Sequence, residues 1–163
     1  MSILTYIFLS ISITFSFMVV GGLAVEALKK SPDYVRLSNF RFIKNDRTYD
    51  LIGVWLIKWA VSKTFWRHFN KKLTLSSGTD LAGLKAMRME MTNAEIGHLV
   101  GLIAQTLLVL VLFILDQSST LIAILIFLNI ILNLYPALLQ QQNKARLDRL
   151  IAVLESRSRV PNC

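Results

Sequence analysis

Cysteine and charge are both scarce in this chain of 163 residues, and each shortage excludes classes of protein. Cys163, the only cysteine, cannot form a disulfide within the chain and excludes metal sites built from cysteine pairs. Charged side chains make up 17% of the sequence and hydrophobic side chains 54%, which excludes intrinsic disorder. The chain is also too short for a series of independent domains, so we expect one domain over residues 1–163.

Three stretches have almost no charge and are long enough to cross a bilayer, which takes about 20 apolar residues. They are residues 3–25, 95–115 and 121–139. The fold class expected is therefore an all-α integral membrane protein with about three transmembrane helices plus interfacial amphipathic helices. No Lys or Arg precedes Lys29, so the basic start of a signal peptide is missing. We expect the first span to be retained as an anchor, with a cleaved signal peptide as the alternative.

Basic residues predict the orientation of these spans. Lys and Arg number 18 against 10 Asp and Glu, and none lies before Lys29 or in the loop 116–120. Since positive charge stays on the cytoplasmic side, the N-terminus and the short loop are predicted outside. Residues 26–94 and 140–163 are then inside, in a multi-pass protein of the cell membrane. Excess positive charge in an apolar chain also points to anionic membrane lipids as partners, rather than to nucleic acid.

Residues 26–94 form a cytoplasmic or interfacial segment in this interpretation. All three tryptophans, Trp55, Trp59 and Trp66, lie within residues 50–69, interleaved with lysine and arginine. This pattern is typical of the lipid head-group layer, so we predict an interfacial or shallow re-entrant helix over 50–69. A helix packed on the spans without lipid contact is the alternative. The polar residues 73–83 that follow are predicted to be a loop.

The tail, residues 140–163, is predicted to be an amphipathic helix. Leu147, Leu150, Ile151 and Leu154 recur at helical spacing, with basic residues off that stripe. Such a helix is expected to leave the membrane and lie along its cytoplasmic surface.

Ionisable and amide side chains inside the spans are the candidates for function. Glu95 and His98 are three residues apart at the start of the second span, so they share a helix face. An antiparallel hairpin places them at the depth of Asn133 to Gln140, within reach of Arg146. Ionisable groups at this depth are expensive and favour a functional role.

A structural role is the alternative for the polar residues of the spans. Amides often hold helices together by hydrogen bonds, and we expect only this of Asn129 and Gln105. No metal site is expected, because Glu95 and His98 are one half of a di-iron motif whose second half is missing.

Several short motifs are similar to those of the glycosyl-diaponeurosporenoate acyltransferases, a family of small membrane proteins that acylate a glucosylated carotenoid. Ala94-Glu95-Ile96-Gly97-His98 resembles the family's Glu-x-x-His segment. The series Asn133, Gln140, Asn143, Arg146 and Leu147 resembles its Asn-x6-Gln-x2-Asn-x2-Arg-Leu pattern. Gly53 followed by Lys58-Trp59 resembles a third motif, and the likeness covers residues 45 to 150 in the same order.

The resemblance implies transfer of a fatty acyl group from acyl-CoA or a similar thioester to a hydroxyl of a membrane-held lipid or glycosylated carotenoid. His98 would act as the base and Glu95 would orient and stabilise it. Asn133 or Gln140 would stabilise the oxyanion, and Arg146 would bind phosphates of the donor. The catalytic candidates are thus Glu95 and His98, and the substrate-binding candidates are Asn133, Gln140, Asn143 and Arg146.

No bound cofactor is expected, since the thioester is a substrate. Two other functions stay open from the sequence: a non-catalytic multi-pass scaffold or subunit, and another small lipid-modifying membrane enzyme. The oligomeric state is not indicated by any sequence feature.

The predicted orientation is testable by cysteine labelling. In a Cys163→Ser background, a cysteine placed at Ser77 is expected to react only after the membrane is made permeable, because residues 26–94 are predicted inside. A cysteine in the loop at Ser118 is expected to react in intact cells and serves as the matched positive control. Labelling of Ser77→Cys from the outside alone contradicts the orientation.

Overall fold

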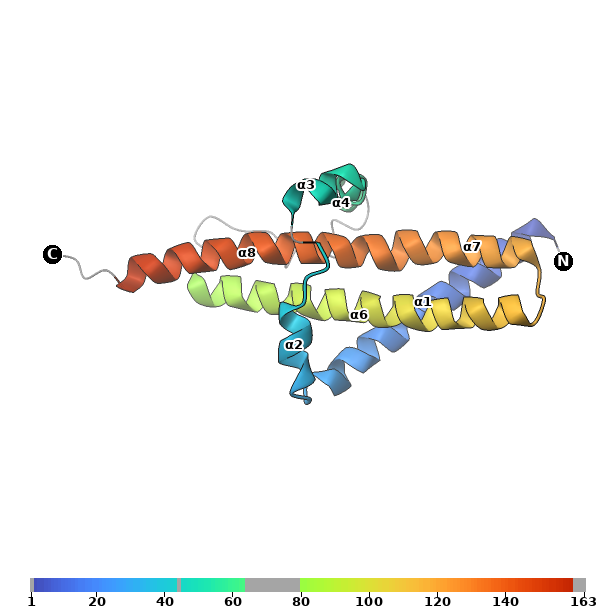
Figure 1. Cartoon of the computed structure of the whole chain (residues 1–163), viewed down its shortest axis with the longest axis horizontal. Coiled ribbons are helices and arrows are strands. Elements are labelled where there is room, and N and C mark those ends of the chain that lie inside the picture. The colour runs from blue at the N-terminus through green and yellow to red at the C-terminus, as the bar shows by residue number, and fades with distance from the viewer. Residues whose placement is uncertain (1, 44, 64–79, 160–163) are drawn as a thin grey trace. The chain divides into compact units, whose positions relative to one another are not determined.

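The computed structural model describes residues 2–43, 45–63 and 80–159, and all regular structure in these ranges is helical (Figure 1). Within these ranges, three helices are long and apolar enough to cross a membrane: Ile3–Leu28, Leu81–Ile114 and Ser119–Ser156. The predicted all-α class with three candidate spans is therefore confirmed. The described chain forms two compact units, and the predicted single domain stays a prediction. The first unit is Met1–Phe40 with Asn93–Ala137, and the second is Arg41–Thr92 with Leu138–Cys163.

The first unit contains the apolar helices. Its elements are α1 (Ile3–Leu28), α2 (Asp33–Asn39), the later part of α6 (Leu81–Ile114), α7 (Ser119–Asn129) and the π-turn η2 (Ile130–Leu134). Ser2 caps α1, because its Oγ accepts the Thr5 N–H at 3.3 Å. Helix α1 packs on α7, and Leu125 is fully buried in a core with Val109 and Leu121.

The outer faces of these helices are apolar. Phe8, Phe113 and Phe127 are 68%, 71% and 63% exposed, and many aliphatic residues of the same helices are exposed too. A water-soluble monomer rarely exposes such a continuous apolar surface. The exposed faces therefore support the interpretation that these helices lie in lipid.

The third predicted span changes its helical geometry just before Pro136. Helix α7 ends at Asn129, and in η2 the Tyr135 N–H bonds the Ile130 carbonyl five residues earlier. Helix α8 (Tyr135–Arg159) then continues through the proline. Proline has no N–H, so the Leu132 carbonyl loses the donor that a regular α-helix would supply from position 136. One extra residue in the turn accommodates this defect without ending the helix.

The second unit is built around two helices. The first turns of α6 contribute Leu84, Met87 and Met91, which pack against Leu147 and Ile151 of α8 in one apolar core. Its other elements are α3 (Asp46–Leu51) and α4 (Val54–Lys63).

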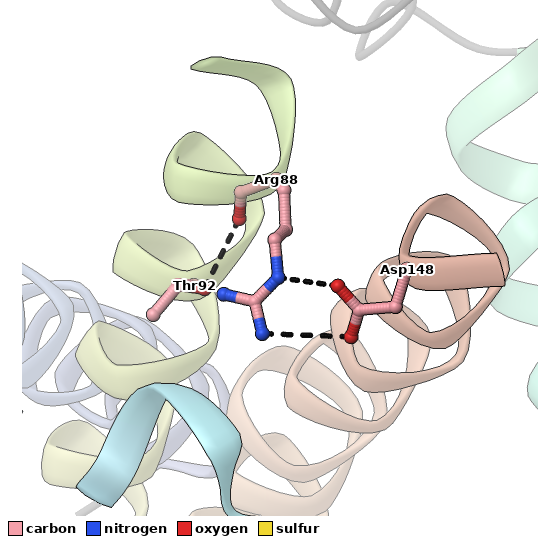
Figure 2. A network of polar contacts seen from close by, with 3 residues as sticks. All are labelled: Arg88, Thr92 and Asp148. Carbon is pink, nitrogen blue, oxygen red and sulfur yellow. Dashed lines mark hydrogen bonds and ion pairs between the residues drawn. The ribbon is translucent and has the colours of Figure 1, made fainter. Parts of the chain in front are cut away.

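Ion pairs flank this core. The Arg88 guanidinium holds both carboxylate oxygens of Asp148, and the longer bond, from Nη2 to Oδ2, is 3.4 Å (Figure 2). Lys85 pairs with Glu155 at 2.6 Å. The bidentate pair between Arg88 and Asp148 and the pair between Lys85 and Glu155 favour one register of α8 against the start of α6. A shift by one helical turn would separate the partners of both ion pairs.

Two sequence predictions change in this unit. Helix α6 begins at Leu81, so residues 81–83 of the predicted loop are helical, while residues 73–79 lie outside the described part. The stripe of the tail packs on α6: Leu147 and Ile151 are buried, whereas Leu150 is 39% exposed. The tail is thus amphipathic as predicted. Its apolar face was expected on the membrane surface, but the first turns of α6 cover much of it.

The predicted continuous helix over residues 50–69 is wrong in its described part. Helix α3 ends at Leu51, and Gly53 has a φ of 80°, a left-handed conformation that breaks the helix before α4 begins. Glycine adopts this conformation without steric cost, which explains a glycine here. Residues 64–69, with Trp66, lie outside the described residues.

The tryptophans of α4 remain predicted to lie at head-group depth. Trp55 and Trp59 are 56% and 59% exposed, so their rings are available to lipid. We expect their fluorescence to be quenched most by lipids labelled near the head groups and least by lipids labelled at the bilayer centre. A Trp66→Phe background restricts the measurement to these two rings. Strongest quenching at the bilayer centre would mean that α4 enters the hydrocarbon core.

Candidate functional site

Helix α6 carries the two predicted catalytic side chains. Glu95 and His98 lie three residues apart on this continuous helix, and Glu95 is buried, with 1% of its surface exposed. His98 is half-buried. A carboxylate and an imidazole thus share one face of α6, as the spacing predicted.

The imidazole of His98 faces η2. Its polar neighbours there are the Asn133 side chain and the Leu132 backbone. The predicted role of Glu95 in orienting His98 stays a prediction, and the polar neighbours of the imidazole that the structure identifies belong to the π-turn. Asn133 is fully buried, so the structure brings one catalytic candidate and one substrate-binding candidate together in the first unit.

Amide side chains join the helices of the first unit in one network. Gln105 Nε2 donates to Thr14 Oγ1 and to the Leu125 carbonyl, both at 3.0 Å. Asn133 Nδ2 donates to Asn129 Oδ1 at 2.8 Å and to Gln105 Oε1 at 3.3 Å. These bonds cross between α1, α6, α7 and η2.

Asn129 completes this network. Its Nδ2 donates to the Leu102 carbonyl at 3.2 Å and to Thr106 Oγ1 at 3.1 Å. The predicted role of Asn129 and Gln105 in hydrogen bonding between helices is therefore confirmed.

Close contacts between helices at glycine residues were not anticipated from the sequence. A Cβ on Gly21 of α1 would overlap the backbone carbonyl of Gly97 on α6. A Cβ on Gly101 would lie 2.9 Å from Asn133 Oδ1 and 3.3 Å from the Phe17 carbonyl. Gly97 and Gly101 form a Gly-x3-Gly pattern, the signal that indicates close packing of membrane helices. Glycine at positions 21 and 101 lets α1 and η2 approach α6 on the His98 face.

The other predicted substrate-binding residues lie on α8 in the second unit. Gln140 is half-buried, and its Oε1 is buried with no hydrogen-bond partner among the described residues. Asn143 is half-buried and Arg146 is exposed. The Arg146 side chain is therefore accessible at the surface of the second unit.

Two more residues of α8 were missed. Lys144 is 4% exposed, although it was counted only as part of the basic tail. Lys144 precedes Leu147 by three residues and Ile151 by seven, so it lies on the same buried stripe of the helix. This spacing is the sequence feature that could have predicted its burial. Buried lysines are normally paired, and Lys144 is not without an interaction partner.

Gln141 holds the chain segment before α3. Its Oε1 accepts the Phe42 N–H at 3.0 Å, the Ile43 N–H at 3.4 Å and the Tyr49 hydroxyl at 2.9 Å. Gln141 and Tyr49 are almost completely buried. One amide oxygen thus attaches the segment 41–43 and helix α3 to α8 within the second unit.

No group of three metal-binding side chains occurs among the described residues, so the structure offers no metal site in that part of the chain. The chemistry available there is that of a carboxylate, an imidazole and amides in an apolar helical protein.

Residues 31–153 match the family model of the glycosyl-4,4'-diaponeurosporenoate acyltransferases. Because the match covers most of the chain, the protein belongs to this family, and the resemblance in its motifs is confirmed. No curated protein and no solved structure matches the chain. Membership of this acyltransferase family supports an acyltransferase function.

The role of Gln141 is testable by substitution. Gln141→Leu keeps the size of the side chain but removes the oxygen that accepts the Phe42 and Ile43 N–H groups, while the Tyr49 hydroxyl keeps the Ile43 carbonyl as an acceptor at 3.1 Å. Each buried polar group left unsatisfied costs about 1–3 kcal/mol. We expect faster proteolytic cleavage in residues 41–53 of membrane-inserted protein, measured by mass spectrometry. Gln117→Leu, at an exposed turn, is the matched control, and equal cleavage in both variants would contradict the role.

Proposed function

We propose that this protein transfers a fatty acyl group from acyl-CoA or a similar thioester to a hydroxyl group of a lipid or glycosylated carotenoid held in the membrane. Membership of the acyltransferase family, together with the buried Glu95 and the half-buried His98 on one helix face, is the observation that carries the proposal. The protein is proposed to be a multi-pass protein of the cell membrane, oriented with both Lys- and Arg-rich segments inside.

In the proposed reaction His98 is the base. It takes the proton of the acceptor hydroxyl, whose oxygen attacks the thioester carbonyl carbon. When the tetrahedral intermediate collapses, the C–S bond breaks and the proton passes from the imidazolium to the thiolate. The C–O ester bond is retained in the product. The imidazolium exists only during the reaction, and the buried negative charge of Glu95 would stabilise it through a medium of low dielectric constant.

The remaining candidates are proposed to bind substrate. Both N–H groups of Asn133 are already used within the protein, so we assign stabilisation of the oxyanion to the side-chain N–H groups of Gln140. Asn143 is proposed to contact substrate, and the exposed Arg146 to bind the donor phosphates.

The test is lipid and pigment profiling of a deletion strain that carries wild-type or variant protein. Without the protein, we expect one acylated lipid to disappear and its unacylated precursor to accumulate. His98→Ala is expected to lower product per unit of membrane-inserted protein by about a hundred- to ten-thousand-fold, the usual contribution of a positioned base. Glu95→Gln is expected to be severe but milder, because it removes the charge and keeps the shape.

His68→Ala is the matched histidine control and is expected to keep near-normal specific activity. Near-normal specific activity of His98→Ala would remove this histidine from the mechanism. A deletion strain with an unchanged acyl-lipid profile would contradict acyl transfer and favour a scaffold.

A further inference from the structure

The three amides of the first unit, Gln105, Asn129 and Asn133, use every N–H group they possess. Each amide nitrogen carries two hydrogens, and each nitrogen donates two hydrogen bonds within the unit. The acceptors are a backbone carbonyl and a hydroxyl for Gln105 and for Asn129, and the oxygens of these two amides for Asn133.

This pattern fixes the orientation of the Asn133 amide. If the amide were turned over, its oxygen would face the oxygens of Asn129 and Gln105, and three acceptors would meet without a donor. Asn133 must therefore present Oδ1, and not Nδ2, to the remaining side of its site. That oxygen is buried and makes no hydrogen bond to any residue that the structure describes.

The remaining acceptor lies on the His98 face of α6. Asn133 Oδ1 is so close to Gly101 that a Cβ there would come within 2.9 Å. Gly101 follows His98 by three residues, so both point to the same side of the helix. The imidazole of His98 indeed faces the Asn133 side chain.

A second acceptor points to the same imidazole. The Leu132 backbone faces His98 as well, and its carbonyl lacks the N–H that position 136 would supply if it were not proline. The π-turn thus offers His98 two hydrogen-bond acceptors and no donor. A neutral imidazole has one N–H group and one acceptor nitrogen, so its N–H is the group that these oxygens attract.

We propose that Asn133 is a positioning residue for His98: its Oδ1 accepts the imidazole N–H and leaves the other ring nitrogen as the acceptor of the substrate proton. The inference rests on the proposed function, in which His98 is the base. Gln105 and Asn129 hold Asn133 in the required orientation, so their bonds serve the site as well as the packing of the helices.

The proposal explains why an amide stands where many hydrolytic enzymes have a carboxylate. In a catalytic triad the partner of the histidine selects one tautomer of the ring. An amide whose donors are all used does the same without adding a charge to the apolar span, where charge is expensive.

The test is the tautomer of His98 in substrate-free protein, measured by solid-state NMR of ¹⁵N-histidine-labelled protein in lipid bilayers near pH 8. The chain has 2 histidines, so the signals of His98 are identified by their loss in His98→Ala. We expect one neutral tautomer in the wild type and both tautomers in Asn133→Leu. The kcat of Asn133→Leu should fall about threefold to tenfold with little change in KM, as for loss of one neutral hydrogen bond.

Gly101→Ala is the second variant, because its new Cβ displaces Asn133 Oδ1 without removing the amide. It is expected to mix the tautomers too, and it decides the question if Asn133→Leu does not accumulate in the membrane. Thr106→Val is the matched control: it removes one acceptor of the Asn129 amide, which keeps the Leu102 carbonyl, and should keep one tautomer.

A single unchanged tautomer in both Asn133→Leu and Gly101→Ala overturns the proposal, as does a mixture in the wild type. These spectra need no substrate. A protein with the expected spectra but no acyl transfer would therefore refute the proposed function and leave the role of Asn133 intact.

Discussion

Polar groups within the apolar helices must be satisfied by other groups of the protein, and the arrangement of the first unit follows from this constraint. In hydrocarbon no water is available to replace a missing partner, and an unpaired amide costs several kcal/mol. Thr14, Gln105, Asn129 and Asn133 come from different helices and satisfy one another. The helices can meet closely enough for these bonds because Gly21 and Gly101 have no side chains at the contacts.

The size of the bonds argues for a role beyond adhesion. A hydrogen bond between membrane helices contributes about 0.6 kcal/mol on average, less than good apolar packing provides. Leucines at these positions would pack the helices together without the cost of a polar group that could be left unpaired. Leucines cannot present a hydrogen-bond acceptor in a fixed orientation. The amides do, because they leave Asn133 Oδ1 as an acceptor beside the half-buried His98.

Much of the fold follows from the sequence because it depends on local composition. Charge-free runs identify the candidate spans, and the three-residue spacing of Glu95 and His98 places them on one helix face. The break at Gly53 and the early start of α6 at Leu81 were not predicted. A glycine inside an apolar run does not by itself indicate a helix break. The stripe of Leu84, Met87 and Met91 indicates a helix only once its packing partners on α8 are known.

The partner of His98 was beyond sequence reasoning for a different reason. Spacing along α6 favoured Glu95, which is near in sequence, over Asn133, which is 35 residues away. The pairing depends on how η2 departs from a regular helix, and this departure has only Pro136 as its signal. Resemblance to the family identified Asn133 as a candidate site residue, but it does not indicate which atom of the amide faces His98.

The π-turn also sets the phase of everything after it. Each residue of an α-helix advances the helix by about 100°, so the extra residue between Ile130 and Leu134 rotates all of α8 by that angle relative to an unbroken helix. Loss of one residue there would leave the composition of α8 unchanged but rotate its apolar and charged faces about the helix axis by the same angle. The stripe of Leu147 and Ile151, and the acid partners of Lys85 and Arg88, would then point elsewhere. The number of residues in this turn therefore decides which side chains of α8 lie on each of its faces.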